Sequence, residues 1–488
     1  RRASKRLRMR ARTSRIRTET TMTKGVKIRL LLLLLAMYSV RSEKRRLRIV
    51  EDPYEEEGIT IRHYGKLSNL HAVNQTQLSS IARSFRGGFV DFALWNGRNA
   101  TDTSAFAYCL ALRTAVVGYE GIAFDVNKIF LLDPVWRDSI ARPEQVTYKH
   151  SPDQPQLDPQ DPQHFALVRW DASWPEPDGW RGWKLVQEEG REWLHRTRII
   201  SILQRSSHAY YHFLAESLPK MFLVLQDFQE HADSVFLLDT SFANTWSLEM
   251  MQLLGISADR CLVRQPGKLY FADTLHIPTP TPLHRAYPTL LLRLRKLLLQ
   301  GALGGDPKRV EREEEGRAEV DKTIVFILRK PSNNQHSHQY SACLQAGGCK
   351  VREIVNAEDV MKAIRNSFDS YRLLTFDSTG MSCRDQISMF SAAHVIIGTH
   401  GAGLTNVMFA PAGGTVIELL PFFLLQSSIT TIFWHVSTAV GLDHRTYPIP
   451  REMMEPDNAT SLHNFRVPLK DFLRHLREHF EMKIGLLE

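Results

Sequence analysis

Between Thr323 and Leu420, short apolar runs rich in valine, isoleucine and leucine alternate with segments of helical pattern. Such runs are typical of buried strands, and two helical segments lie among them: "AEDVMKAIRNS", with Asn356 as its N-cap, and "RDQISMFSAA". The expected strands are "TIVFIL", "VREIV", "YRLLTF", "HVIIG" and "GTVIELL". Strands that alternate with helices predict a parallel, doubly wound sheet, whose ligands bind at the carboxyl ends of the strands.

The expected strand "HVIIG" runs into the loop "THGAG" and then into a short helix that starts near Leu404. Gly401 and Gly403 remove side chains where a ligand must approach the backbone, and free N–H groups at a helix start favour phosphate. Side-chain donors in the same stretch are His400, Thr405 and Asn406. The loop therefore predicts a phosphate site, with an ordinary strand-to-helix turn as the alternative.

A second group of polar side chains lies in "RSSHAYYHFLAESLPK". In a helix, His208, His212 and Glu216 are spaced i, i+4 and i+8 and share one face. Pro219 is expected to kink or end this helix. Three interpretations remain open: metal ligands, a general base with its orienting partner, or buried polar groups that satisfy one another.

The two stretches together, in this order, resemble glycosyltransferase family 61. The matching segments are Tyr210 to Lys220 and His400 to Leu419, and "FILRK", "REIVNAE" and the pair Asp385-Gln386 between them also fit. The resemblance covers roughly residues 201–450. The residues then expected to bind the donor are Arg329, Asn356, Glu358, His400, Gly401, Gly403, Leu404, Thr405, Asn406 and Glu418, with His208, Tyr211 and Arg352 as further site residues.

The resemblance implies an α/β fold of the GT-B type, with two Rossmann-type doubly wound domains facing a cleft. It implies an inverting transferase that moves GlcNAc or xylose from a UDP-sugar to a hydroxyl of a glycoprotein or glycan. Glu216, and after it His212, is the expected general base, Arg329 is expected to contact the diphosphate, and no obligatory metal is expected. The alternatives are a non-catalytic relative that binds glycans and a metal-dependent hydrolase that uses His208, His212 and Glu216.

The amino-terminal residues are strongly basic. The net charge is +9, but residues 1–48 alone carry +15, which leaves −6 on the other 440 residues. A protein that grips nucleic acid keeps positive charge on its fold, so no nucleic-acid partner is expected. Within this tail, the uncharged run Leu30–Val40 has eleven residues. It is short for a membrane span and fits a signal peptide or a short type II anchor.

Three Asn-x-Thr triplets, at Asn74, Asn99 and Asn458, agree with a secretory-pathway lumen, either endoplasmic reticulum or Golgi. The protein is then expected to be soluble in the lumen or attached to the membrane through its N-terminal segment. Cys343 and Cys349 are close enough in sequence to close a small loop.

Two breaks in composition, the Pro-rich "SPDQPQLDPQDPQ" and the charged residues 301–322, suggest how the chain is divided. The expected parts are the basic tail 1–48, an N-terminal region 49–200 with part of the first Rossmann-like domain, the remainder of that acceptor-side domain 201–300, the linker 301–322, a nucleotide-sugar-binding Rossmann-like domain 323–450, and a C-terminal helical segment 451–488.

Overall fold

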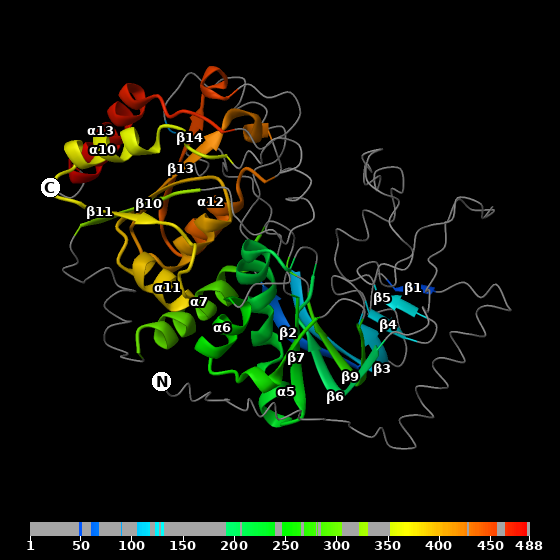
Figure 1. Ribbon diagram of the computed structural model, residues 1–488. Helices are drawn as coiled ribbons and strands as arrows, with labels where there is room; N and C mark the ends of the chain where they lie inside the picture. Colours follow the sequence, from blue (N-terminus) through cyan, green and yellow to red (C-terminus); the bar gives the residue numbers. More distant parts are fainter. Residues whose placement is uncertain are drawn as a thin grey trace, which may run out of the picture. The chain divides into compact units, whose positions relative to one another are not determined.

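The computed structural model of the chain contains two β-sheets with helices packed against them (Figure 1). Both sheets belong to Leu47–Glu488, which packs as one compact unit. The residues that the structure describes are 48–50, 60–67, 89, 105–117, 123–125, 128–130, 192–204, 207–239, 246–264, 268–279, 281, 285–304, 322–329, 352–426, 429–455 and 464–485.

The sheet in the second half of the chain is wholly parallel, in the order β11-β10-β12-β13-β14. Its strands are β10 (Thr323–Ile327), β11 (Arg372–Phe376), β12 (Val395–Thr399), β13 (Thr415–Pro421) and β14 (Asp443–Ile449). The first four lie where the sequence predicts strands. The parallel sheet expected from the alternating pattern is confirmed.

Two details of this sheet differ from the sequence prediction. "VREIV" forms no strand, because Arg352 has a φ of 63°, a left-handed conformation that cannot continue an extended chain. Ile354 makes only an isolated bridge to Phe465. The fifth strand is β14, "DHRTYPI", which begins with four polar residues and so offers no apolar run from which to predict it.

Side chains of the parallel sheet alternate between two apolar layers. Ile324 and Phe326 of β10 belong to a layer shared with α10 and α13, whereas Val325 and Ile327 belong to a layer shared with α11, η8 and α12. The helices are α10 (Ala357–Ser367), α11 (Cys383–Ser391), the 3-10 helix η8 (Ala402–Phe409), α12 (Ile432–Ala439) and α13 (Leu469–Gly485). Helices thus cover both faces, as expected for a doubly wound sheet.

The sheet in the first half of the chain is mixed, in the order β1-β5-β4-β3-β9-β6-β7-β8, with β2 paired to β3. Its strands are β1 (Arg48–Val50), β2 (Thr60–Leu67), β3 (Ala105–Val117), β4 (Ala123–Asp125), β5 (Lys128–Phe130), β6 (Glu192–Ser201), β7 (Ser234–Leu238), β8 (Cys261–Val263) and β9 (Lys268–Pro278). β9, β6, β7 and β8 are parallel to one another. Only these four strands have the parallel arrangement expected of a Rossmann-type domain. The 13-residue strand β3 instead runs antiparallel to both β9 and β2.

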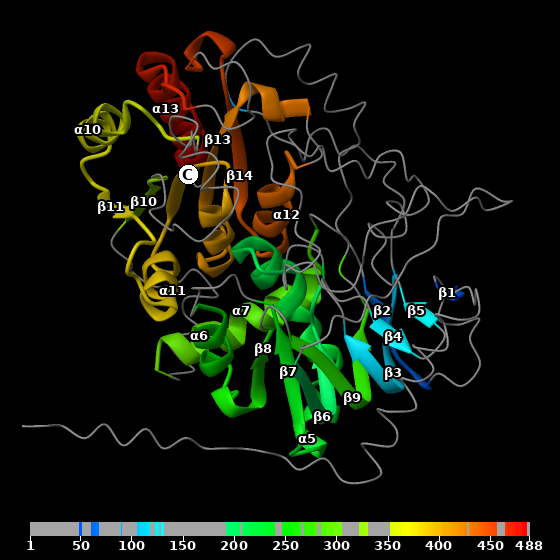
Figure 2. The same cartoon turned by 45° about the vertical axis from the view of Figure 1, so that its right-hand side comes forward.

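The helices of the first half of the chain are η5 (His212–Ser217), η6 (Leu218–Leu223), α5 (Leu225–Glu230), α6 (Trp246–Leu253), η7 (Ala258–Arg260) and α7 (Pro288–Ala302). α6 and α7 lie on the side of the first sheet that faces the second sheet in both views, whereas α5 lies at the lower end of the first sheet (Figures 1 and 2). α7 contacts η6 and α6 of the first half of the chain and α11, α12 and η8 of the second half. One hydrophobic cluster therefore continues from the first sheet to the second, with Phe236 of β7 and Val416 of β13 as members.

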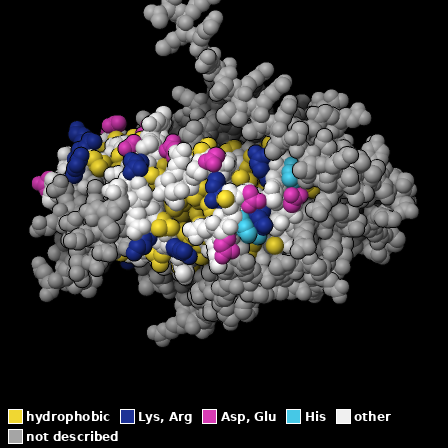
Figure 3. Space-filling view, turned by 90° about the horizontal axis from the view of Figure 1, so that it is seen from below, with side chains coloured by type: hydrophobic (Ala, Val, Ile, Leu, Met, Phe, Trp, Pro, Cys, Tyr) yellow, Lys and Arg dark blue, Asp and Glu magenta, His cyan; other side chains and the backbone are white. Residues whose placement is uncertain are grey.

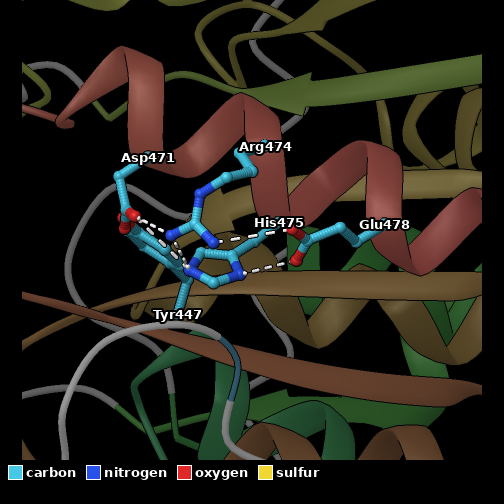
Figure 4. Close-up of polar contacts among 5 residues, drawn as sticks. All are labelled: Tyr447, Asp471, Arg474, His475 and Glu478. Carbon is cyan, nitrogen blue, oxygen red and sulfur yellow. Dashed lines mark hydrogen bonds and ion pairs between the residues drawn. The ribbon is translucent and has the colours of Figure 1, made fainter.

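The last helix, α13, is tied to the last strand by a polar network (Figure 4). The hydroxyl of Tyr447 on β14 donates to Oδ2 of Asp471 at 2.7 Å, and Oδ1 of Asp471 accepts from Nη2 of Arg474 at 2.5 Å. His475 lies 3.4 Å from the Asp471 carboxylate and 3.2 Å from that of Glu478. One aspartate thus links the sheet to the helix.

We expect Tyr447→Phe to lower the free energy of unfolding by about 1 kcal/mol, the net contribution of one hydrogen bond. Burial raises the pKa of Asp471, but the hydrogen bonds from Tyr447 and Arg474 outweigh burial and leave the pKa below its ordinary value. A carboxyl group with a lowered pKa stabilises the fold above its unfolded-state pKa, and that contribution is lost as the pH falls through the folded-state pKa. Urea denaturation should therefore show a smaller effect of the substitution at about pH 3 than at about pH 7. Equal losses at both pH values would contradict this account.

Some sequence predictions concern residues outside the described ranges. These are the basic tail with its leucine run, the three Asn-x-Thr triplets, the Pro-rich stretch, most of the linker 301–322, and Cys343 with Cys349. None of the helices that the structure does describe has the length and apolar character needed to cross a membrane. Seen from below, the described surface mixes basic, acidic and apolar side chains (Figure 3).

Candidate active site

The parallel sheet has its topological switch point between β10 and β12. β10 lies between β11 and β12, so the crossovers that follow β10 and β12 lead to opposite sides of the sheet. Ligands of such sheets bind at this point, outside the carboxyl ends of the strands. Arg329 comes just after β10 and His400 just after β12, and Nη1 of Arg329 donates to the backbone oxygen of His400 at 3.1 Å. The fold therefore brings two of the sequence candidates together where a ligand is expected.

The two glycines of the loop serve the packing of neighbouring side chains. A Cβ atom at Gly401 would overlap Nη1 of Arg329, so only glycine lets the guanidinium group lie against the loop. A Cβ atom at Gly403 would lie 3.2 Å from Cγ2 of Ile327, which is tight against the core. The place beside Gly401 thus holds a guanidinium group, a side chain suited to phosphate binding, in addition to backbone N–H groups.

The helix after this loop is a 3-10 helix that begins at Ala402, with Gly401 as its N-cap, and not an α-helix from Leu404. Leu404 is fully buried in the core, and its N–H group donates to the backbone oxygen of Gly401 at 2.9 Å. Thr405 is also fully buried, and its hydroxyl has no hydrogen-bond partner among the residues described. Leu404 is therefore a packing residue, whereas Thr405 has an unused polar atom.

Arg352 brings a second guanidinium group to the switch point. Burial and the like charge of Arg329 lower the pKa of Arg352 to about 9, against the opposing effect of Glu418. Nε of Arg352 is buried and makes no hydrogen bond within the described part of the chain. Its backbone is left-handed, a conformation that costs free energy in a residue other than glycine. Such strained residues are frequent at binding sites. Two neighbouring guanidinium groups that repel each other favour an anion between them.

Glu418 of β13 is buried between two histidines. Its Oε1 lies 2.5 Å from Nδ1 of His400, and its Oε2 lies 3.1 Å from Nε2 of His444 on β14. Burial alone would raise the pKa of Glu418, but the contacts with His400 and His444 outweigh it and lower the pKa to about 2. Burial lowers the pKa of His400 in spite of the carboxylate beside it. We therefore assign an ionised Glu418 beside a neutral His400.

Sequence reasoning missed His444 and Thr446, although both contact Glu418. The register of β13 and β14 places Thr446 directly beside Glu418, and its Oγ1 lies 3.5 Å from Oε2. The only signal in the sequence is that these two polar residues are two positions apart in "DHRTYPI". This spacing places both on one face of a strand but does not say which strand lies beside it.

The His212–Glu216 pair is formed as the i, i+4 spacing predicts. Nδ1 of His212 lies 2.8 Å from Oε2 of Glu216, and the same oxygen accepts from Nε2 of Gln204 at 2.9 Å. Glu216 is fully buried, whereas the side chain of His212 is 18% exposed. A carboxylate that accepts the Nδ1–H of a histidine leaves its Nε2 able to take a proton. The difference in exposure favours His212 over Glu216 as the group that meets an acceptor.

His208 lies in the turn before the helix, so the expected three-residue face contains only His212 and Glu216. The helix is π-helical over His212–Ser217 and then becomes the 3-10 helix η6, because Pro219 lacks an N–H group and obstructs the regular α-helical bonding. Burial lowers the pKa of His208 against the opposing effect of Asp239. Within the described residues, no three His, Cys, Asp or Glu side chains are arranged to hold a metal ion.

The two sequence motifs contact each other in the fold. The hydroxyl of Tyr210 donates to Oδ1 of Asn406 at 2.7 Å, across 196 positions of sequence. The rings of Tyr211 and His400 both pack against Phe433 of α12, with centroid distances of 5.7 Å and 5.0 Å. Burial and the Glu216 carboxylate raise the pKa of Tyr211 well above its ordinary value. Phe433 thus links the residue beside His212 to His400.

Three other sequence candidates lie in different surroundings. Asn356 is the N-cap residue of α10, but its side-chain amide bonds the backbone N–H and oxygen of Val467, both at 2.9 Å. Asn406 uses its amide nitrogen on Oε1 of Gln386 at 3.4 Å, in addition to its bond with Tyr210. Glu358 is exposed on the first turn of α10. These contacts of Asn356 and Asn406 connect parts of the fold.

Comparison with known proteins identifies the region that holds these residues. Residues 210–417 match the family model described as Glycosyltransferase 61. The chain contains a glycosyltransferase 61 domain. Over 110 residues the chain is 28% identical to Protein O-linked-mannose beta-1,4-N-acetylglucosaminyltransferase 2 of Canis lupus familiaris, a match that spans 22% of this chain and 18% of that protein. The resemblance inferred from the sequence motifs is confirmed.

The matched part of the glycosyltransferase 61 domain starts at Tyr210, two residues before η5, and ends within β13. The His212–Glu216 pair, both arginines and His400 lie inside it. Glu418 follows its last matched residue, and His444 lies farther along the chain.

Proposed function

We propose that the glycosyltransferase 61 domain transfers a sugar from a UDP-sugar to a hydroxyl of a glycoprotein or glycan, with inversion at the anomeric carbon. The convergence of Arg329, Arg352 and His400 at the switch point of the parallel sheet carries this proposal. GlcNAc and xylose are the candidate sugars, and the name of the canine relative supports GlcNAc. We further propose a GT-B-like arrangement, with residues 323–450 as the donor side and residues 201–300 as the acceptor side.

The donor side is suited to a diphosphate because of its charges. A UDP-sugar carries two negative charges on its diphosphate, and Arg329 and Arg352 supply two positive charges beside each other. During transfer, negative charge increases on the diphosphate as its bond to the sugar breaks. Cations that are already in place stabilise that charge without reorganisation.

The acceptor side is suited to proton removal. The acceptor oxygen forms a bond to the anomeric carbon from the face opposite the diphosphate, the bond from that carbon to the phosphate oxygen breaks, and UDP leaves with the electron pair. Nε2 of His212 receives the proton of the acceptor hydroxyl. Glu216 stabilises the resulting imidazolium through its contact with Nδ1 at 2.8 Å. In this proposal His212 is the general base and Glu216 is its orienting partner. From the sequence, Glu216 is instead expected ahead of His212 as the base.

The proposed partners are a nucleotide sugar and a glycoprotein or glycan acceptor, and the proposed location is the lumen of the endoplasmic reticulum or Golgi. The apolar run within the basic tail and the three Asn-x-Thr triplets support this location. The same run supports attachment to the membrane if it is retained.

Thermal shift with UDP-GlcNAc and UDP-xylose tests the donor site. A donor at 100 times its Kd should stabilise the protein by about 2.7 kcal/mol. Arg352→Met should weaken donor binding by about ten- to a hundred-fold, since a hydrogen bond to a charged group contributes about 1.5–3 kcal/mol and about 1.4 kcal/mol is tenfold. Arg372→Met is the matched control, because Arg372 is exposed at the amino end of β11 in the same sheet.

No binding of either UDP-sugar by the wild-type protein would refute the proposed function. Binding that Arg352→Met leaves unchanged would place the donor away from the switch point. Normal binding with no transfer to any glycoprotein or glycan acceptor would instead support the non-catalytic relative.

A further inference from the structure

A buried chain of hydrogen bonds runs from the switch point across β13 to β14 and α12. His400 contacts Oε1 of Glu418, His444 contacts Oε2, and Oγ of Ser437 on α12 lies 2.9 Å from Nδ1 of His444. All four side chains are at least 96% buried. Burial of this many polar groups is costly unless their hydrogen bonds are satisfied, so the chain indicates a role beyond packing.

The acceptor capacity of the carboxylate decides which atoms carry hydrogens. An ionised carboxylate only accepts, so Nδ1 of His400 and Nε2 of His444 both donate to Glu418. With the hydrogen of His444 on Nε2, its Nδ1 accepts the hydroxyl hydrogen of Ser437. With its one hydrogen on Nδ1, a neutral His400 has no hydrogen on Nε2, which can therefore accept one.

We propose that Glu418 and His444 are positioning residues that keep Nδ1 of His400 protonated, so that Nε2 takes a proton from solvent when the donor diphosphate binds and meets it as a cation. This inference rests on the proposed function. It adds a third positive charge to the donor site, and that charge is present only while the anion is bound.

The groups that face His400 explain why its charge depends on the ligand. Arg329 after β10 and Arg352 on the neighbouring loop oppose a positive charge on His400, as does burial, whereas Glu418 on β13 favours it. α12 contributes the ring of Phe433, which carries no charge. An anion placed beside the two guanidinium groups removes their repulsion, and His400 can then become protonated.

Isothermal titration calorimetry measures the proton directly. UDP-GlcNAc, or UDP-xylose if it binds better, is titrated at several pH values in buffers that differ in their ionisation enthalpy. The diphosphate of a UDP-sugar is esterified at both ends and does not titrate near neutral pH, so any proton taken up belongs to the protein. For the wild-type protein, uptake should approach one proton within a pH window that lies between the pKa of His400 in the free protein and its higher pKa in the complex, and should fall off on both sides of that window.

His444→Leu removes one donor from Glu418 and makes the His400–Glu418 pair more basic. The window of proton uptake should therefore move to higher pH. His444→Gln keeps an N–H donor near the position of Nε2 and should restore the wild-type window. If the leucine variant does not fold, Ser437→Ala should move the window in the same direction by a smaller amount.

Each outcome decides a separate claim. No UDP-sugar binding by the wild-type protein would refute the proposed function and this inference with it. Binding without proton uptake at any pH would refute the inference alone. A leucine variant that folds, binds more weakly and keeps the wild-type window would show that His444 only supports the structure.

Discussion

His212→Ala is expected to lower the turnover of sugar transfer by about 10²–10⁴-fold, the range for loss of a general base. The reason is that His212 is the partly exposed member of its pair, whereas Glu216 is fully buried and cannot touch the acceptor directly. Transfer should be measured at saturating UDP-sugar. Donor affinity should remain normal, since the two arginines of the donor side are unchanged.

Glu216→Gln should produce a loss of similar size by another route. Oε2 of Glu216 contacts both Nε2 of Gln204 and Nδ1 of His212, and an amide oxygen in its place can still accept both hydrogens. The amide carries no negative charge, however, so it no longer stabilises the imidazolium that forms when Nε2 receives the proton. Glu230→Gln is the matched control, because it makes the same change on an exposed residue of α5.

Residues that act as one unit do not show additive losses. The double variant His212→Ala/Glu216→Gln should therefore be no slower than the slower single variant. If both single variants bind UDP-sugar normally and retain more than about a tenth of wild-type turnover, the base lies elsewhere.

The parts of the fold that follow from short-range pattern could be predicted from the sequence. Three strands of the parallel sheet, β10, β12 and β13, are recognisable because each buries both faces and is a nearly continuous apolar run. α11 is recognisable because Ser382 caps it by accepting from the backbone N–H of Asp385. The contact of His212 with Glu216 follows from a spacing of four residues, which brings side chains together on π-helical and α-helical turns alike.

The parts that depend on long-range pairing could not be predicted. Glu418 meets His444 only because β14 lies beside β13, and nothing within either strand specifies its neighbour. Likewise, β3 joins the first sheet by pairing with β9, a strand more than 150 residues later in the sequence. The left-handed conformation of Arg352 could not be predicted either, because "VREIV" has the composition of a strand.

Gly401→Ala is expected to weaken donor binding by about ten- to a hundred-fold, as much as Arg329→Ala, while the protein stays folded. The added Cβ atom would overlap Nη1 of Arg329, the far end of a flexible side chain. The guanidinium group can move away at little cost to stability, but it then loses its bond to the backbone oxygen of His400 and its place at the switch point. Calorimetry with UDP-GlcNAc measures the loss, and thermal denaturation checks the fold.

A double-mutant cycle separates this mechanism from a direct effect of the glycine on the diphosphate. If alanine at position 401 acts by displacing Arg329, the substitution has nothing left to displace in an Arg329→Ala background. The double variant should then bind the donor as weakly as Arg329→Ala alone. Losses that simply add would mean that Gly401 contacts the diphosphate through its own backbone, independently of the arginine, as the sequence pattern first suggested.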